Sequence, residues 1–553
     1  MIRSILCLTI LFLTVVASFA DDSQLFGRDV RLDDQGKLLS CVVSDSPYDQ
    51  IIQRAWQAFE SIPVQSNDYR TYIDYPTFRG PNDPDGPPFS GKIWAHNPAG
   101  LFAMLTDGAI LYHAYSGDTV VLDRVREMLD HMITFGTTDP NDYWALSPYA
   151  SGDAGNPVYR GGTDIIYCDQ ENHTPCGRGD GPGFLEPDKI GELGFAYLQF
   201  YEVTLERKYL QAAIHCADAL AAHIRPGDQS HSPWPFRVDA KTGTIIREEY
   251  TANTIGPIRL FDELLRLKLG DVPSYARARE LAWHWLMTYP MENMVWTQYF
   301  EDVLIYDDYR VNRNQYSALE TARYLLQHPE KDPQALVHAK WLVDWVTGLF
   351  ARDSKTMAGL HEKGLQWGAE ALSEQVNDMD KMTSHTARYA SVRALCYEKT
   401  GDADSKERAF RSFNWCSYSE RDDGLVKTSL DEGTGYWFSD GYGDYMRHFQ
   451  RGMASVPEWA PVHQPHLLGS SSIVREVHYG ANQISYLTFD KASHEILKLP
   501  TPPLRIRAGT NKLPPVDNIA GFDEGYSVEA LNGGGFAVRV KHKNAARIRV
   551  IWN

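Results

Sequence analysis

Apolar residues recur with helical spacing between residues 47 and 453, and most of the helical stretches come in pairs. Five pairs are predicted, over residues 97–115 with 119–135, 187–204 with 208–223, 251–268 with 274–287, 314–326 with 334–350, and 383–399 with 405–415. Short turns join the partners, such as YSGD at 115–118 and KTGD at 399–402. Gly can close the first helix with positive φ, and Asp can cap the next. The pattern therefore predicts repeated helix hairpins.

Two predicted helices, at 47–59 and 440–453, have no neighbour in the chain to pair with. If they pair with each other, six hairpins close into a ring, which leaves no terminal repeat to be capped. The first helix of each pair then lies inside the ring. The loops that precede the inner helices converge on one end, and several of them are long enough to indicate binding or catalysis. These loops cover residues 69–96, 136–186, 225–250, 289–313, 352–382 and 417–439.

From about residue 465 the apolar pattern changes to alternation with a period of two. Strands are predicted at 473–479, 483–489, 495–499, 536–541 and 546–552, which together indicate a small antiparallel β-sandwich. We expect residues 21–460 to form the helical domain and 461–553 the sandwich. A structural role for the sandwich is favoured over carbohydrate binding.

The N-terminal residues 1–20 have the pattern of a secretory signal peptide, with Arg3, an apolar run from Ile5 to Val16 and a small-residue exit before Asp21. The run is short for a membrane span, and no later stretch is long and apolar enough. We therefore expect a secreted or periplasmic protein without a membrane partner. Cys168 and Cys176 are candidates for a short disulfide there.

Composition narrows the range of partners. The net charge of −18 argues against nucleic acid, and it disfavours an anionic polymer unless Arg and Lys gather at the site. The chain has 14 Trp and 30 Tyr, more than helix packing usually requires, so some rings are expected to bind sugars. Residues 81–86 and 164–180 contain enough acids to suggest a calcium site, but neither matches the spacing of an EF-hand loop. No metal or cofactor is therefore expected, and the oligomeric state cannot be read from the sequence.

A chain with six helix hairpins, aromatic and acid-rich loops at one end and a C-terminal β-domain resembles the six-hairpin, (α/α)6-toroid carbohydrate-active enzymes. That group includes glycoside hydrolases, polysaccharide lyases and, in a related form, uronyl epimerases. The resemblance covers residues 45–455 by architecture alone. It implies a carbohydrate substrate, and it supplies no catalytic residue.

Candidate catalytic residues follow from their positions in the loops. Glycoside hydrolysis needs a proton donor and a second carboxylate. Asp308 lies in an acidic, aromatic loop just ahead of an inner helix. Glu374 precedes the fifth inner helix with His385 one turn inside it, and Asp440 stands at the start of the sixth. An alternative interpretation of Asp440 is a helix cap, and of His385 a core histidine.

Other residues in these loops and first turns are candidates for substrate binding. They are Trp94, His96, Asp188, Trp234, Glu249, Tyr250, Tyr309, Arg310, Asp378, Trp437 and Asp444. Trp234, in a Pro-flanked turn, is expected to be a rigid exposed ring for stacking.

The leading hypothesis is a secreted glycoside hydrolase that cleaves a polysaccharide or oligosaccharide with two loop carboxylates. The first alternative is a polysaccharide lyase or C5-epimerase, in which Tyr or His removes the C5 proton of a uronosyl residue and Arg or Asn stabilises the carboxylate. The second alternative is a carbohydrate-binding protein without catalysis.

Overall fold

The computed structural model describes residues 24–78, 96–163, 165–169, 174–178, 181–247, 252–297, 313–351, 367–376, 378–430 and 435–553. At 165–169, 174–178, 247 and 378–379 it describes the backbone only. The predicted signal peptide therefore lies outside the described residues, as do the side chains of Cys168 and Cys176. Their backbones lie in the paired strands β3 (Ile165–Asp169) and β4 (Thr174–Arg178).

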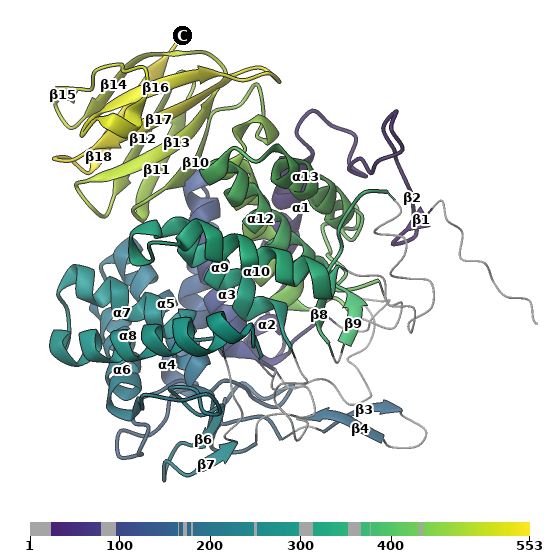
Figure 1. Ribbon diagram of the computed structural model, residues 1–553, viewed down its shortest axis with the longest axis vertical. Coiled ribbons are helices and arrows are strands. Elements are labelled where there is room, and N and C mark those ends of the chain that lie inside the picture. Colours follow the sequence, from purple (N-terminus) through teal and green to yellow (C-terminus); the bar gives the residue numbers. More distant parts are fainter. Residues whose placement is uncertain are drawn as a thin grey trace, which may run out of the picture.

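Six buried helices form the inner wall of a ring (Figure 1). They are α3 (Pro98–Ser116), α5 (Pro187–Thr204), α7 (Ile255–Leu267), α9 (Gln315–Gln327), α12 (Thr383–Thr400) and α14 (Met446–Ser455). The outer helices are α1 (Pro47–Glu60), α4 (Val120–Phe135), α6 (Arg207–His223), α8 (Val272–Leu286), α10 (Ala335–Phe350) and α13 (Ala403–Ser417). α14 contacts α1, α3 and α12, so the predicted pairing of the first and last helices and the closed ring are confirmed.

The helix ends follow from local sequence. Asn97 caps α3 by accepting a hydrogen bond from the Gly100 amide at 3.1 Å, and Gly117 ends the helix with φ of 80°. Gly401 ends α12 in the same way with φ of 74°, and the Asp402 side chain caps α13. The short turns at 115–118 and 399–402 thus form as predicted.

The last inner helix begins later than predicted. Residues Ser439–Asp444 form the π-helix η3, and α14 follows from Met446. A second π-helix, η1 (Met287–Met291), contains Pro290 and extends α8. The wider turn of η3 carries two of the predicted site residues, Asp440 and Asp444.

Short elements occupy the segments around the ring. They are β1 (Gln24–Leu25), β2 (Arg28–Asp29), α2 (Thr71–Asp74), β5 (Phe184–Leu185), β6 (Arg237–Asp239), β7 (Ile245–Arg247), η2 (Pro329–Lys331), β8 (Ser373–Gln375), β9 (Asp378–Lys381) and η4 (Pro457–Trp459). β5, β6 and β7 form one antiparallel sheet and β8 and β9 another. The β8–β9 hairpin leads directly into α12.

The C-terminal β-sandwich has two antiparallel sheets. One has the order β10-β13-β17-β16 and the other β11-β12-β18-β14-β15. Their strands are β10 (His466–Ser470), β11 (Val474–Gly480), β12 (Gln483–Thr488), β13 (Ser493–Leu499), β14 (Pro503–Ala508), β15 (Asn511–Lys512), β16 (Gly525–Ala530), β17 (Phe536–His542) and β18 (Arg547–Trp552), with η5 (Ile519–Gly521) between β15 and β16. The five predicted strands are β11, β12, β13, β17 and β18. The other four were missed because most are short or lie at sheet edges, where the alternation of buried residues is weak.

The sandwich packs on the end of the ring where the short turns lie (Figure 1). Tyr479 donates a hydrogen bond from its hydroxyl to the Ala114 carbonyl at 2.6 Å, and the His466 ring stacks on Tyr115 at 4.0 Å. Arg475 donates to the Val203 carbonyl near the end of α5. The opposite end, where the inner helices begin, is therefore the end to search for a site. Among the described residues no helix combines the length and apolar character needed to cross a bilayer.

Candidate functional site

Three predicted catalytic residues come together where α12 and η3 begin. Glu374 from β8 approaches His385 of α12, with 3.2 Å between carboxylate Oε1 and imidazole Nε2. Asp440 of η3 accepts a hydrogen bond from the Ser384 hydroxyl at 3.1 Å. The β8–β9 hairpin, the first turn of α12 and the π-turn thus hold two carboxylates and a histidine in one cluster. Asp440 is partly exposed, whereas His385 is buried.

The protonation state of His385 follows from its partners. Arg388, one turn along α12, donates from Nη1 to His385 Nδ1 at 3.0 Å. A guanidinium can only donate, so Nδ1 must accept, and the ring proton of a neutral imidazole sits on Nε2. His385 therefore donates to Glu374. Because the Nδ1 lone pair accepts the hydrogen bond from Arg388, it is not available to take a proton from a substrate.

Asp440 has the pKa of a group that can hold a proton near neutrality. Burial is the largest cause, His385 opposes it, and the nearby Glu374 and Asp444 carboxylates add to it, so the pKa of Asp440 rises to about 6. A carboxyl with such a pKa can act as a general acid.

A path of contacts leads from this cluster into the ring. Arg388 lies over the Tyr316 ring at 4.2 Å, and the Tyr316 hydroxyl donates to Glu192 Oε1 at 2.8 Å. The Asn253 amide donates to the same oxygen at 2.8 Å. Burial raises the pKa of Tyr316, so its hydroxyl stays protonated and donates to Glu192.

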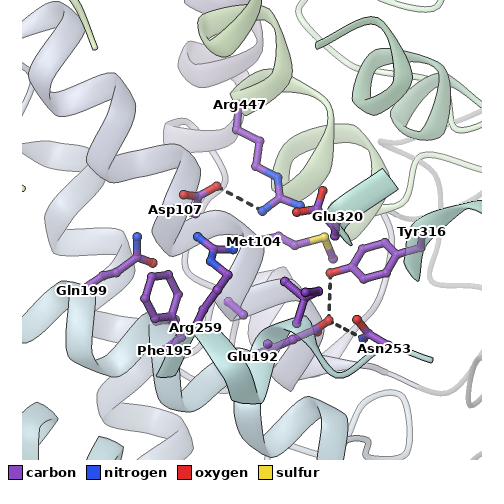
Figure 2. Close-up of a pocket in the computed structure, with 14 residues that line it drawn as sticks. Met104, Asp107, Glu192, Phe195, Gln199, Asn253, Arg259, Tyr316, Glu320 and Arg447 are labelled. Carbon is purple, nitrogen blue, oxygen red and sulfur yellow. Dashed lines mark hydrogen bonds and ion pairs between the residues drawn. The ribbon is translucent and has the colours of Figure 1, made fainter. Parts of the chain in front are cut away.

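Glu192 and Tyr316 face a cavity at the centre of the ring (Figure 2). Its walls come from α3, α5, α7, α9 and α14, and it is partly open to solvent. Charged groups on the wall are Asp107, Glu192, Arg259, Glu320 and Arg447, beside Phe195, Gln199 and Asn253. The polar and charged lining of this cavity suits a hydrophilic ligand better than an apolar one.

Buried ion pairs hold the inner helices together behind the cavity. Asp444 binds Arg388 and also Arg447, with 3.0 Å from Arg447 Nε. His448 approaches Asp444 at 2.9 Å. Burial would raise the pKa of Asp444, but the guanidiniums of Arg388 and Arg447 outweigh it and hold that pKa well below its usual range.

The predicted binding role of Asp444 does not fit this position. Asp444 is 1% exposed and its carboxylate is occupied by these cations. Asp188, in the first turn of α5, is also buried. Its carboxylate accepts from Asn253 at 3.2 Å, and burial, opposed by Lys189, raises its pKa. Trp437, half-buried, lies just ahead of η3 and remains a candidate for stacking.

Two residues that were predicted to bind substrate are buried in the core. Trp234 is 3% exposed and its indole N–H donates to the Leu220 carbonyl at 2.9 Å, so the expected exposed stacking ring is wrong. Proline-flanked turns can fold inward as easily as outward. His96 is 1% exposed and packs edge-on against Phe102 and Tyr159, and burial lowers its pKa to about 3. A neutral ring enclosed in this way does not face the cavity.

Several predicted residues lie outside the described part of the chain. These are Trp94, Glu249, Tyr250, Asp308, Tyr309 and Arg310, whose roles stay predictions. Asp378 is described only by its backbone, in β9. Within the described ranges, no three His, Cys, Asp or Glu side chains are grouped so as to hold a metal ion.

Sequence analysis did not single out Glu192, Arg388 or Tyr316 for the site. Two of them could have been found from their spacing to a predicted residue along a helix. Glu192 lies four residues after Asp188, and Arg388 lies three after His385, so each shares a helix face with that residue. Arg259 and Arg447 carried no such signal, because only the closed ring brings α7 and α14 to one cavity.

Comparison with known proteins supports the architecture. No protein-family model matches this sequence, and a search of curated proteins finds no sequence relative. The crystal structure of a D-mannose isomerase superposes with a TM-score of 0.52 at 12% identity, covering 76% of this chain and 100% of the isomerase. This likeness is one of fold, and it agrees with the predicted (α/α)6 toroid of six helix hairpins.

Weaker structural matches span other activities. The cellobiose 2-epimerase from Spirochaeta thermophila DSM 6192 superposes with a TM-score of 0.45 at 12% identity, over 74% of this chain and 98% of that one. The GH76A alpha-1,6-mannanase from Salegentibacter sp. HEL1_6 gives 0.42 at 12% identity, over 73% and 98%.

Proposed function

We propose that this protein is a glycoside hydrolase that acts on a polysaccharide or oligosaccharide, and that it is exported from the cytoplasm. The observations that carry the proposal are the two carboxyl groups held at the start of α12, Glu374 at His385 and Asp440 at Ser384, and the raised pKa of Asp440. Two carboxyl groups with different protonation states are what glycoside hydrolysis requires.

The two carboxyl groups take different roles. Asp440 donates its proton to the oxygen of the leaving sugar, because its raised pKa keeps it protonated below pH of about 6. Glu374 is the second carboxylate, which either attacks the anomeric carbon or activates a water. His385 positions Glu374 through its Nε2–H.

Proton abstraction by an epimerase or isomerase is the second candidate, and the fold shared with a D-mannose isomerase favours it. It needs a base that faces the sugar. Among the described residues the two candidate bases fit less well, since His385 Nδ1 accepts from Arg388 and burial raises the pKa of Tyr316. Hydrolysis is therefore the better-supported reaction.

Incubation with a panel of neutral and acidic polysaccharides tests the proposal. We expect new reducing ends without the ultraviolet absorbance of an unsaturated sugar. Absorbance that rises with the reducing ends would assign elimination instead, and an altered sugar in chains of unchanged length would assign epimerisation.

A variant pair ties the activity to this cluster. The double variant D440N/E374Q should be inactive on any cleaved member of the panel, whereas D517N, at an exposed aspartate of the sandwich, should retain the full rate. Equal activity in all three proteins would exclude the cluster as the catalytic site.

A further inference from the structure

Arg259 differs from the other arginines around the central cavity. It lies in the second turn of α7, and its guanidinium sits over the Phe195 ring at 4.2 Å (Figure 2). Within the described residues it has no hydrogen bond or ion pair. Arg447, on the same cavity wall, instead binds Asp444 and lies 3.1 Å from Asp107. Arg259 is therefore a cavity-lining guanidinium whose N–H groups are not taken up by a described protein partner.

The acids near Arg259 already have cations of their own. Asp107 forms ion pairs with Arg447 at 3.1 Å and with Arg451 at 2.5 Å. Glu320 forms ion pairs with Arg323 at 3.4 Å and with Arg388 at 3.5 Å. Glu192, which also lines the cavity, has Lys189 at 3.5 Å.

The sum of these buried charges, on the cavity wall and in the ion pairs behind it, is positive. Three buried carboxylates, those of Asp107, Glu320 and Asp444, face four guanidiniums, of Arg323, Arg388, Arg447 and Arg451, and Arg259 makes a fifth. Burial would raise the pKa of Glu320 and of Asp107, but neighbouring arginines lower both, so the carboxylates are ionised. Burial lowers the pKa of Arg451 to about 9, and the charges of Arg323 and Arg447 add to that effect.

We infer that the substrate is an acidic glycan and that Arg259 binds its anionic group in the central cavity. This inference rests on the proposed function. A uronosyl carboxylate and a sulfate ester offer the same chemistry, an oxyanion that accepts paired hydrogen bonds from a guanidinium. The guanidinium lies over the Phe195 ring, and the Gln199 amide lines the same cavity. Locally gathered arginines are also what a chain of net charge −18 needs in order to accept an anion.

Substrate selectivity of R259Q tests the inference. Wild type, R259Q and the control R277Q, at an exposed arginine of α8, are assayed on oligosaccharides of equal length that are neutral, uronate-bearing or sulfated. We expect the ratio of kcat/KM on an acidic to a neutral chain to fall about ten- to a hundredfold in R259Q, the effect of losing one charge-assisted contact. R277Q should keep the wild-type ratio, and R259K should restore part of it.

The pattern of losses identifies the anion. A fall confined to uronate chains assigns the carboxylate, and a fall confined to sulfated chains assigns the sulfate ester. An unchanged ratio in R259Q, with hydrolysis intact, would overturn the inference while the proposed function stands. Thermal unfolding by circular dichroism separates a selectivity change from misfolding.

Direct binding distinguishes the two proposals if no chain is cleaved. Saturation-transfer NMR with the uronate-bearing and sulfated oligosaccharides would then show binding of one of them to wild type and its loss in R259Q, which supports the anion site and contradicts hydrolysis. Equal binding to wild type and R259Q, or no binding of either chain, would contradict the anion site.

Discussion

Asp440 and Asp444 are four residues apart in η3, yet their pKa values are shifted in opposite directions. Both lose hydration on burial, which raises a carboxyl pKa. Asp444 is compensated by Arg388 and Arg447, so it stays ionised, whereas Asp440 faces Glu374 and Asp444 and rises to about 6. The nearest charges thus make one aspartate a structural anion and the other a candidate acid.

The raised pKa of Asp440 predicts a pH-dependent cost to stability. Because the folded protein holds this proton more tightly than the unfolded chain, the contribution of Asp440 is complete below about pH 4 and is lost as the pH rises through about 6. Asp440→Asn removes the ionisation. We expect D440N to be more stable than wild type at pH 8, by about 1–3 kcal/mol, and the difference to vanish near pH 4.

Urea unfolding of both proteins at pH 4, 6 and 8 measures this difference. D517N, which changes an exposed aspartate, should follow wild type at every pH. A D440N protein that is less stable than wild type at pH 8 would show that ionised Asp440 is favourably bound.

For single residues, the sequence predicted which side chains gather at the start of the inner helices better than it predicted which of them are exposed. Glu374, His385 and Asp440 could be found because acids and a histidine stood at the start of predicted inner helices. His96 and Trp234 stood in equally suitable positions, but their rings are buried, and burial depends on neighbours that are distant in the chain. Arg259 could not be found, because an unpaired cation is visible only once its neighbours are known.

At the element scale, the inner helices approach closely where glycines face them. Gly191 in α5 packs against Pro257 in α7, and a Cβ at residue 191 would overlap the proline ring. Gly191→Ala should therefore destabilise the protein by about 1–3 kcal/mol through overpacking.

Gly348 provides the matched control, because it lies in outer helix α10 and a Cβ there would meet nothing within 4 Å. Gly348→Ala should stabilise by up to about 1 kcal/mol through helix propensity. Chemical denaturation of both variants measures the contrast. Equal effects of the two substitutions would mean that α5 and α7 are not in close contact.

The hairpins themselves were predictable because the paired helical stretches are joined by short turns, three of which contain a glycine, Gly117, Gly270 or Gly401. The π-turns η1 and η3 were not, since their extra residue leaves the apolar pattern almost unchanged. As a result α14 was predicted to begin at residue 440, six residues before Met446.

At the scale of the whole molecule, the sandwich closes one end of the ring. Tyr479 links the two parts, since its hydroxyl donates to Ala114 and accepts from the Leu467 amide at 3.0 Å. Tyr479→Phe leaves both groups without this partner and should lower the free energy of unfolding by about 1–3 kcal/mol.

Calorimetry measures whether the substitution also lowers the melting temperature of the helical ring. Because the interface joins α3 to the sandwich, we expect Y479F to lower the melting temperature of both parts, with little change in activity at 25 °C. A shift confined to a separate sandwich transition would mean that the two parts unfold independently. Tyr201→Phe is the comparison, because Tyr201 lies in α5 and meets Phe489 of the sandwich through its ring, away from these two hydrogen bonds.

The most direct test of the central claim, that Asp440 donates a proton in glycoside hydrolysis, is the dependence of D440N activity on the leaving group. A substrate with a sugar leaving group needs the proton, whereas an aryl glycoside with a strongly acidic phenol does not. The account predicts that D440N loses about 10²–10⁴-fold in kcat on the first and keeps most of its rate on the second. An equal loss on both substrates would contradict it.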